Sequence, residues 1–414
     1  MKNDISVEKA IRYAMSQNVT MLGIGPMSLN IIKASTELAH ELDFPLMFIA
    51  SRNQVDKDRF GSGYANNWNQ ERFVDDIMRV VHNTGYTGLT YICRDHGGQW
   101  QRDTEKARRL PYDEATRNAY ESFTADIHAG FDLLHIDPTK DPHNCSVSLA
   151  EVIDRVVATL EYTEHHKPES MRLAYEIGTE ENSGGAILLG DFEHFIQSLY
   201  KKIELLNLPK PCFIVGQTGT LVKMTRNAGR FDDSKTGELS GIARKYGIGF
   251  KEHNADYLPL NELLMHPIAG ITAANVAPEF GVEETRALLK LGRQVDSSEF
   301  SELLERHVLT GDKWIKWLDR EHAGIDVRAV IAEPKLRREI AEIAGHYYFN
   351  DPEIKDAKQA LYAFAKRHGV EDPEKQIRND IKKAIVKYIN AFNLSGFTAK
   401  LRQNVKLTSD RQNR

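Results

Sequence analysis

The stretch LTYICRD at residues 89–95 is an apolar run that ends abruptly in two charged residues. Such a run, nearly continuous in apolar and β-branched residues, is typical of a parallel strand that is covered on both faces. It therefore predicts one strand of a parallel sheet. Runs of the same kind recur along the chain at 20–25, 46–51, 133–137, 173–178, 212–217, 249–253 and 270–276.

Helical patterns separate these runs. The segment SLAEVIDRVVATLEYT at 148–163 has Ser148 as its predicted N-cap, with Glu151 three residues later, which is a capping-box arrangement. Eight alternations of strand and helix predict an α/β fold, a closed (β/α)₈ TIM barrel. A doubly wound open sheet is the alternative, because a sequence pattern does not report closure. Further helices are expected at 30–42, 70–83, 112–129, 191–206 and 283–292, with less regular ones at 237–246 and 258–265.

The last part of the chain contains helical patterns only, such as PKLRREIAEIAGHYY at 334–348. We therefore expect a TIM-barrel catalytic domain at 1–295 and a helical C-terminal extension at 296–414. The extension is expected to pack on the barrel or on a partner chain. Its polar end is expected to fray after about residue 403.

The composition is that of a soluble globular protein, with 41% apolar and 27% charged residues among 414. The net charge of −5 provides no basic face for nucleic acid. No apolar run is long enough to cross a membrane, and the first residues lack the apolar core of a secretion signal. We expect a cytoplasmic protein with no nucleic-acid or membrane partner.

The cysteines are too few for a disulfide framework or a cysteine-based zinc site: Cys93, Cys145 and Cys212.

Polar residues follow the point where each apolar run stops. In a barrel enzyme the carboxyl ends of the strands form the face that carries the chemistry. One such residue alone would fit a salt-bridged rim, but burying so many polar groups at one end is costly without a functional reason. These residues are Arg52, Asn53, Gln54, Arg94, Asp95, His96, His135, Asp137, Glu176, Glu180, Gln217, Glu252, His253, Asn254, Asp256 and Asn275.

Imidazoles and carboxylates in this set suit a divalent metal such as zinc or manganese. His96 and His253 follow different strands and are expected to converge across the barrel, with Glu176 as an oxygen ligand. Asp95 directly precedes His96, so a bend at the strand end is needed to bring both side chains inward. With a metal polarising a carbonyl oxygen, a nearby carboxylate can move a proton during enolate chemistry.

Other conspicuous residues are interpreted as structural. The run Gly23-Ile24-Gly25-Pro26 lacks the third glycine of a dinucleotide site and is expected to form a tight turn between strand and helix. Four histidines are expected to be surface or packing residues: His128, His135, His165 and His166.

Several short pieces match one known pattern in order and spacing along nearly the whole chain. They are Asn53-Gln54-Val55, Asp95-His96, His135-Ile136-Asp137, Ile177-Gly178-Thr179-Glu180 with Gly184-Gly185, Glu252-His253 with Asp256-Tyr257, and Tyr347-Tyr348. Together they resemble the Z-subunit family of class II tagatose-bisphosphate aldolases. The chain departs from that family at Arg94, where a glycine is usual, at Gly97-Gly98-Gln99-Trp100, and in lacking a Gly-Gly-Ser-Gly loop after His253.

The resemblance implies a barrel of the class II aldolase superfamily that uses a divalent metal, zinc first, with manganese or magnesium as alternatives. It implies that Asp95 transfers a proton, that His96 and His253 are metal ligands, and that the strand-five glutamate of the family is Glu176 or Glu180. Some family members resemble stand-alone 4-epimerases that act on tagatose 6-phosphate or related ketoses. Others resemble accessory subunits that stabilise a separate aldolase chain.

We therefore expect a metal-dependent 4-epimerase or class II aldolase that breaks the C3–C4 bond of a ketose or ketose phosphate through an enediolate. The alternatives are a non-catalytic subunit bound to a class II aldolase and a ketose 3-epimerase, for which Glu176 with Asp137 or Asp95 would flank the sugar. The expected assemblies are a homo-oligomer or a complex with a class II aldolase partner subunit. The expected catalytic carboxylates are Asp95, Glu176 and Asp137, the expected metal ligands His96, His253 and Glu180. The expected substrate contacts are Arg52, Asn53, Gln54, Arg94, Gln217, Asn254, Asp256 and Asn275, with Lys223 and Arg226 as further candidates for a phosphate.

Overall fold

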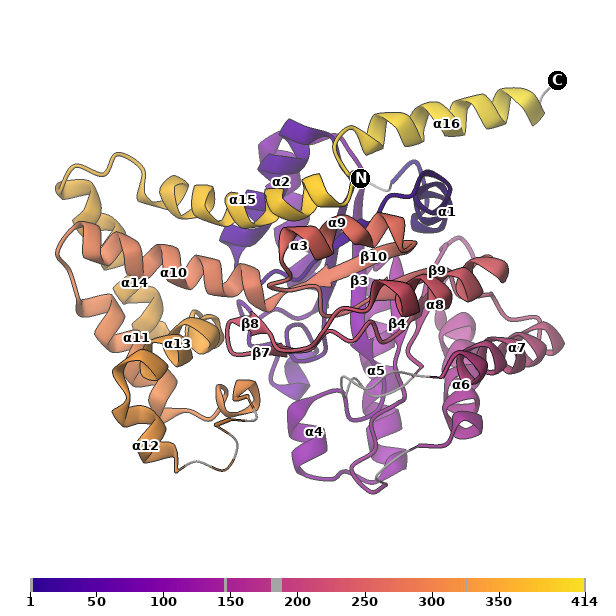
Figure 1. The fold of residues 1–414 in the computed structure, drawn as a ribbon, viewed down its shortest axis with the longest axis horizontal. Coiled ribbons are helices and arrows are strands. Elements are labelled where there is room, and N and C mark those ends of the chain that lie inside the picture. Colours follow the sequence, from indigo (N-terminus) through magenta and orange to yellow (C-terminus); the bar gives the residue numbers. More distant parts are fainter. Residues whose placement is uncertain are drawn as a thin grey trace.

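Eight parallel strands close into a barrel in the computed structural model (Figure 1), which describes residues 3–412 apart from 145–146, 180–187, 320, 323 and 325. The strands follow chain order around the barrel, and the last pairs with the first through Met21 and Ala273. This closure confirms the TIM barrel and excludes the open sheet. The strands are β1 (Met21–Ile24), β2 (Leu46–Ala50), β3 (Thr90–Gly97), β4 (Leu133–Ile136), β5 (Ala174–Ile177), β6 (Phe213–Val215), β9 (Gly249–Glu252) and β10 (Ile271–Val276).

Helices cover the outside of the barrel between successive strands. Ser148 caps one of them as predicted, because its side chain accepts a hydrogen bond from the backbone N–H of Glu151. The strand segments are almost entirely buried, which explains their continuous apolar character. The covering helices are α2 (Leu29–Leu42), α3 (Gln70–Thr84), α5 (Tyr112–Ala129), α6 (Leu149–His166), α7 (Leu189–Leu205), α8 (Asp233–Lys245), α9 (Leu260–Ile268) and α10 (Pro278–Gln294).

Some short elements were not predicted. Helix α1 (Val7–Gln17) buries Ile11, which lies beside Gly249 at the amino-terminal end of β9. A two-stranded hairpin of β7 (Val222–Lys223) and β8 (Arg226–Asn227) follows β6 at the opposite, carboxyl end of the strands. The short helices η1 (Asp58–Phe60) and α4 (Asp103–Ala107) lie in the loops after β2 and β3.

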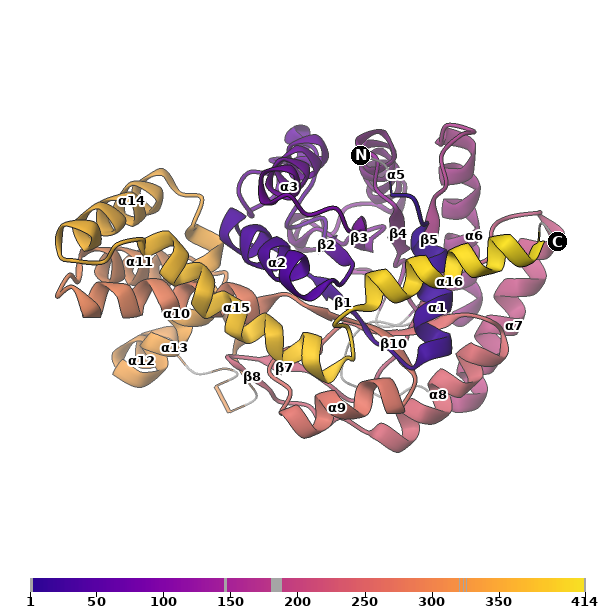
Figure 2. The same cartoon turned by 90° about the horizontal axis from the view of Figure 1, so that it is seen from above.

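The chain after residue 295 forms helices and, among the described residues, no strand. Figures 1 and 2 show α11 to α14 gathered on one side of the barrel, while α15 packs against α2 and α10. The last helix continues to Gln412, and fraying of the tail after about residue 403 stays a prediction. We keep the domain boundary near residue 295 as a proposal. The elements are α11 (Glu299–Thr310), η2 (Ile315–Trp317), α12 (Val327–Ala332), α13 (Pro334–Ala344), η3 (Gly345–Tyr348), α14 (Pro352–Arg367), α15 (Pro373–Ala391) and α16 (Phe397–Gln412).

None of the helices that the structure describes is long and apolar enough to cross a membrane.

Candidate metal centre

Strand β3 bends at its carboxyl end. Its register with β4 shifts between Arg94 and Gly97, and His96 has a left-handed φ of 45°. Adjacent residues of a regular strand point to opposite faces, whereas a bulge redirects one of them. The bend therefore brings the consecutive side chains of Asp95 and His96 to the same place, as the sequence argument required.

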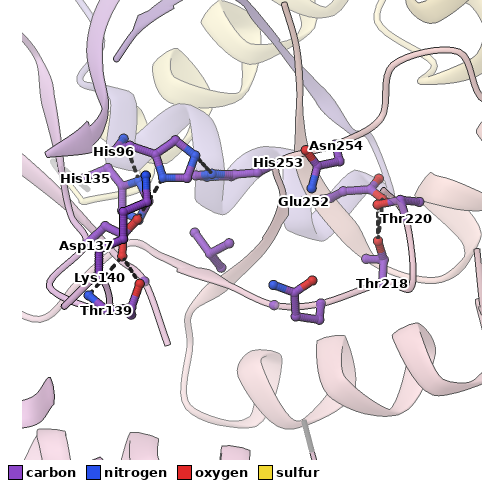
Figure 3. Close-up of a pocket in the computed structure, with 14 residues that line it drawn as sticks. His96, His135, Asp137, Thr139, Lys140, Thr218, Thr220, Glu252, His253 and Asn254 are labelled. Carbon is purple, nitrogen blue, oxygen red and sulfur yellow. Dashed lines mark hydrogen bonds and ion pairs between the residues drawn. The ribbon is translucent and has the colours of Figure 1, made fainter. Parts of the chain in front are cut away.

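Asp95 and His96 meet two further side chains, His135 at the end of β4 and His253 directly after β9. One donor atom from each of these four residues lies within 4.8 Å of the others. Nε2 of His96 is 3.1 Å from Nδ1 of His253, and Oδ1 of Asp95 is 3.5 Å from the same Nδ1 atom. Figure 3 shows the three imidazoles turned toward one another. We call these four residues the metal cluster.

Of the two structural roles expected for His135, surface and packing, the structure shows a buried residue, which also lies in the metal cluster. Its side chain is 1% exposed, and its Nδ1 atom accepts a hydrogen bond from the backbone N–H of His96 at 3.0 Å. Its Nε2 atom is buried and has no hydrogen-bond partner among the described residues. A signal for this was present, because His135 stands two positions before Asp137 and both therefore point to the same face of the strand.

Two carboxylates outside the metal cluster fix the histidine tautomers. Oδ2 of Asp137 is 2.7 Å from Nδ1 of His96, and Oε1 of Glu176 is 2.6 Å from Nε2 of His253. An ionised carboxylate only accepts hydrogen bonds, so each ring directs an N–H toward its carboxylate. We assign these tautomers from the hydrogen bonds, and they leave Nε2 of His96 and Nδ1 of His253 as the nitrogens that face each other.

Two facing nitrogens at 3.1 Å need a cation between them, because their lone pairs repel. Ligand atoms around tetrahedral zinc, with Zn–N bonds of about 2.0–2.1 Å, lie roughly 3.3 Å apart. The observed spacing and the imidazole–carboxylate donor set therefore fit a divalent metal of the zinc class. A proton is the other cation that fits, and the neighbouring Asp95 and Asp137 carboxylates raise the pKa of His96 against the opposing effect of burial.

The electrostatics of the metal cluster keep Asp95 ionised. Burial alone would raise the pKa of this carboxyl group, but the imidazoles of His96, His253 and His135 outweigh burial and hold the pKa well below its usual range. Burial has the opposite effect on His253 and lowers its pKa to about 4. The site therefore combines a carboxylate that can accept a proton with neutral imidazole at His253.

A cavity of about 230 Å³ opens beside the metal cluster. Its wall includes His96, His135 and His253 together with the predicted contacts Gln217 and Asn254. On the far wall, Glu252 accepts hydrogen bonds from the hydroxyl groups of Thr218 and Thr220, which holds the loop after β6 in place. Most of the residues that line the cavity are polar.

Comparison with known proteins supports the fold. No family model and no curated protein matches this sequence. The structure of a probable tagatose 6 phosphate kinase from Sinorhizobium meliloti 1021 matches with a TM-score of 0.73 and 17% identity, covering 90% of this chain and 100% of that chain. Fructose-bisphosphate aldolase from Campylobacter jejuni matches with a TM-score of 0.54 and 12% identity, covering 94% and 96%. The YdjI aldolase from Escherichia coli K12 matches with a TM-score of 0.53 and 10% identity, covering 96% and 100%.

The chain shares its fold with sugar-bisphosphate aldolases. This agrees with the barrel fold that the sequence resemblance implied. At these levels of identity the likeness concerns the fold.

In this aldolase-like barrel, three predicted substrate contacts have structural roles instead. Arg52 and Arg94 are both 0% exposed, and their guanidinium groups pair with Glu105 at 2.8 Å and Asp126 at 2.5 Å. Arg94 links β3 to α5, and Arg52 links the loop after β2 to α4 in the loop after β3, so neither guanidinium group is free to bind a sugar or a phosphate. Asp256 accepts the backbone N–H groups of Ala277 and Glu279 and so caps the start of α10.

Other predicted contacts also lie apart from the cavity wall. The amide of Asn53 donates to the carbonyl oxygen of Gln101, and that of Gln54 donates to the sulfur atom of Met27. Asn275, which is 2% exposed, donates to Oδ1 of Asp95 at 3.2 Å and thus positions a carboxylate of the metal cluster.

The remaining predicted groups separate into three cases. Lys223 and Arg226 belong to the hairpin after β6, where they contact Lys316 and Asp319 of the C-terminal extension. Glu176 is 0% exposed and lies behind His253. Glu180 lies outside the described residues.

Proposed function

We propose that this protein is a metal-dependent 4-epimerase or aldolase that breaks the C3–C4 bond of a ketose or ketose phosphate. One observation carries the proposal. Two carboxylate-anchored imidazoles present facing nitrogens 3.1 Å apart, beside the ionised carboxylate of Asp95 and a polar cavity. The names of the structural neighbours, which include aldolases and a probable tagatose 6 phosphate kinase, support a sugar phosphate as the substrate class.

His96 and His253 would hold the metal through these facing nitrogens, with the carboxylate of Asp95 beside them. His135 would not supply a third nitrogen, because its Nδ1 atom accepts the backbone N–H of His96 and the neutral ring then carries its proton on Nε2. Zinc is the first choice for such a donor set, with manganese or magnesium as alternatives. When bound, a divalent metal polarises a carbonyl oxygen and stabilises the negative charge that develops when the adjacent carbon–carbon bond breaks.

The protein's own groups would supply the proton transfer and the orientation. Asp95 accepts the proton of the C4 hydroxyl group, and Asn275 holds its carboxylate in place through the 3.2 Å hydrogen bond. The side chains of Gln217 and Asn254 line the cavity and orient the sugar hydroxyl groups. A 4-epimerase additionally lets the released aldehyde turn before the bond forms again, whereas an aldolase lets it leave.

The 3-epimerase alternative receives less support from the site. That reaction needs two carboxylates on opposite faces of the sugar, but both oxygens of Glu176 already bind Lys251 and His253. Asp137 is likewise committed to His96. The accessory-subunit alternative predicts binding to an aldolase chain and no turnover.

The test is a substrate panel. The protein is stripped of metal, reloaded separately with Zn²⁺, Mn²⁺ or Mg²⁺, and incubated with ketohexoses, their 6-phosphates and their 1,6-bisphosphates. Carbon-13 NMR then distinguishes a 4-epimer, a pair of three-carbon products, a 3-epimer and unchanged sugar. Turnover that requires metal supports the proposal, whereas unchanged sugar in every fully loaded sample would overturn catalysis and favour the accessory role.

A further inference from the structure

A buried ion pair lies directly behind the metal cluster, inside the barrel. Nζ of Lys251 on β9 is 2.6 Å from Oε2 of Glu176 on β5, and the two side chains are 1% and 0% exposed. Lys251 stands two positions before His253, so strand alternation directs both side chains to the same interior face. The ion pair therefore adjoins the metal cluster from the side opposite the cavity.

Glu176 joins this lysine to the metal cluster because its two oxygens have different partners. Oε2 accepts from Lys251, and Oε1 accepts from Nε2 of His253 at 2.6 Å. A carboxylate held at both oxygens cannot rotate without breaking a charged hydrogen bond, and here both partners are buried. The orientation of the His253 ring is thereby tied to the position of the lysine ammonium group.

A second histidine of the metal cluster, His96, is held in the same way. Asp137 uses Oδ2 for Nδ1 of His96, while its Oδ1 atom accepts from the hydroxyl group of Thr139 at 2.5 Å. In both cases one carboxylate oxygen orients the imidazole and the other is anchored by a separate donor. The repetition indicates that the anchoring donors serve the histidines.

We propose that Lys251 is a positioning residue that acts through Glu176 to keep Nδ1 of His253 directed at the metal. This inference rests on the metal centre of the proposed function. The ammonium group balances the buried charge of Glu176 and fixes the rotation of its carboxylate. With both oxygens committed, Glu176 orients His253 and does not act on the substrate.

A barrel-stabilising ion pair without a role at the metal is the competing explanation. Arg94 and Asp126 provide the matched comparison, because this pair is equally buried and its cation also comes from a barrel strand, β3. It does not include any residue of the metal cluster. Loss of either pair should weaken the fold, but only loss of Lys251 should change metal binding.

The experiment measures the dissociation constant for Zn²⁺ by competition with a chromogenic chelator, with folding monitored by circular dichroism. The variants are Lys251→Met, Glu176→Gln and a double variant that carries both changes. The control is a second double variant, which carries Arg94→Met and Asp126→Asn. Outer partners of metal ligands typically change metal affinity by about 10–100-fold, so we expect Lys251→Met to bind Zn²⁺ at least about tenfold more weakly. The control should bind like the unaltered protein.

The double variant tests whether Lys251 and Glu176 affect Zn²⁺ binding through the same contact. If they do, its loss of affinity is smaller than the product of the two single losses, because the second change removes a contact that is already lost. A folded Lys251→Met or double variant that binds Zn²⁺ as tightly as the unaltered protein would overturn the positioning role. Absence of Zn²⁺ binding by the unaltered protein would instead overturn the metal centre itself.

A measurement on the unaltered chain is independent of how the variants fold. Histidine labelled with ¹⁵N, with His253→Ala for assignment, reports which ring nitrogen carries the proton. We expect His253 to carry it on Nε2, toward Glu176. A proton on Nδ1 would contradict the proposal.

Discussion

Nε2 of His96 lies 3.1 Å from Nδ1 of His253, although 157 positions separate the two residues along the chain. The bend at the end of β3 and the exit of the chain from β9 bring the rings together, and Asp137 and Glu176 turn their unprotonated nitrogens inward. The contact between these two residues is the basis of the expected metal dependence.

Replacing either of these histidines should abolish stoichiometric metal binding. We expect His96→Ala and His253→Ala to purify with little zinc, because each change removes one of the two facing nitrogens. Elemental analysis of protein reconstituted with Zn²⁺ measures this directly. His165→Ala, on the exposed end of α6, is the control and should keep its zinc. Equal zinc content in all three variants would show that the ion binds elsewhere.

Asp95→Asn should remove turnover while preserving the fold. The amide has nearly the same shape but cannot take the hydroxyl proton, and loss of a general base typically reduces the rate about 10²–10⁴-fold. Steady-state kinetics with the substrate found in the panel gives the effect on kcat and KM. The exposed Asp75 provides a control as Asp75→Asn, which should leave both parameters unchanged. Full activity of Asp95→Asn would assign proton transfer to another group.

Arg94→Met should destabilise the protein without a specific effect on substrate binding. The change leaves Asp126 as an unpaired buried charge, and breaking one side of a buried ion pair typically costs about 3–5 kcal/mol. Urea unfolding measures the loss in the free energy of unfolding. Arg94→Met combined with Asp126→Asn should recover part of it, because no charge then remains buried. A large rise in KM with unchanged stability would restore Arg94 as a substrate contact.

Asp256→Asn should change how stability depends on pH. Burial raises the pKa of Asp256 to about 8, whereas an unfolded aspartate titrates at about 3.9. Because the folded state then binds a proton that the unfolded state releases, this contribution to stability is present below pH of about 4 and is lost as the pH rises through about 8.

The asparagine does not titrate, but its carbonyl oxygen can still accept the N–H groups of Ala277 and Glu279. Thermal melts across this pH range should therefore be flatter for Asp256→Asn than for the unaltered protein. KM should not change, since Asp256 caps α10. An unaltered pH profile would show that Asp256 is already ionised in the folded protein.

Local patterns in the sequence were sufficient to predict the alternating strands and helices of the barrel. Eight apolar runs, each followed by an amphipathic helix, report directly on strands buried on both faces. The short hairpin after β6 was missed because its two-residue strands are too short for a periodic pattern. Helix α1 was missed although it is amphipathic, with Val7, Ala10, Ile11 and Ala14 on its buried face. Closure itself was a prediction until β1 was found paired with β10.

The candidate site was likewise predicted in part from the sequence. The chemistry of Asp95, His96 and His253 was visible from residue type and from their positions at strand ends. Arg52 and Arg94 were misassigned because a strand-end arginine looks the same in sequence whether it faces a substrate or an aspartate on an outer helix. The sequence predicted only a structural role for His135, because its place beside Asp95, His96 and His253 depends on contacts between different strands.

The sequence by itself therefore determined the secondary structure, the fold class and the types of groups at the carboxyl ends of the strands, because these depend on hydrophobic periodicity and residue chemistry within short segments. Only the tertiary structure decided which polar groups face one another, which are already paired, and that Lys251 lies behind His253. Those relationships depend on register, on the bend in β3 and on contacts across the barrel, and no local pattern encodes the distance between side chains that different strands contribute.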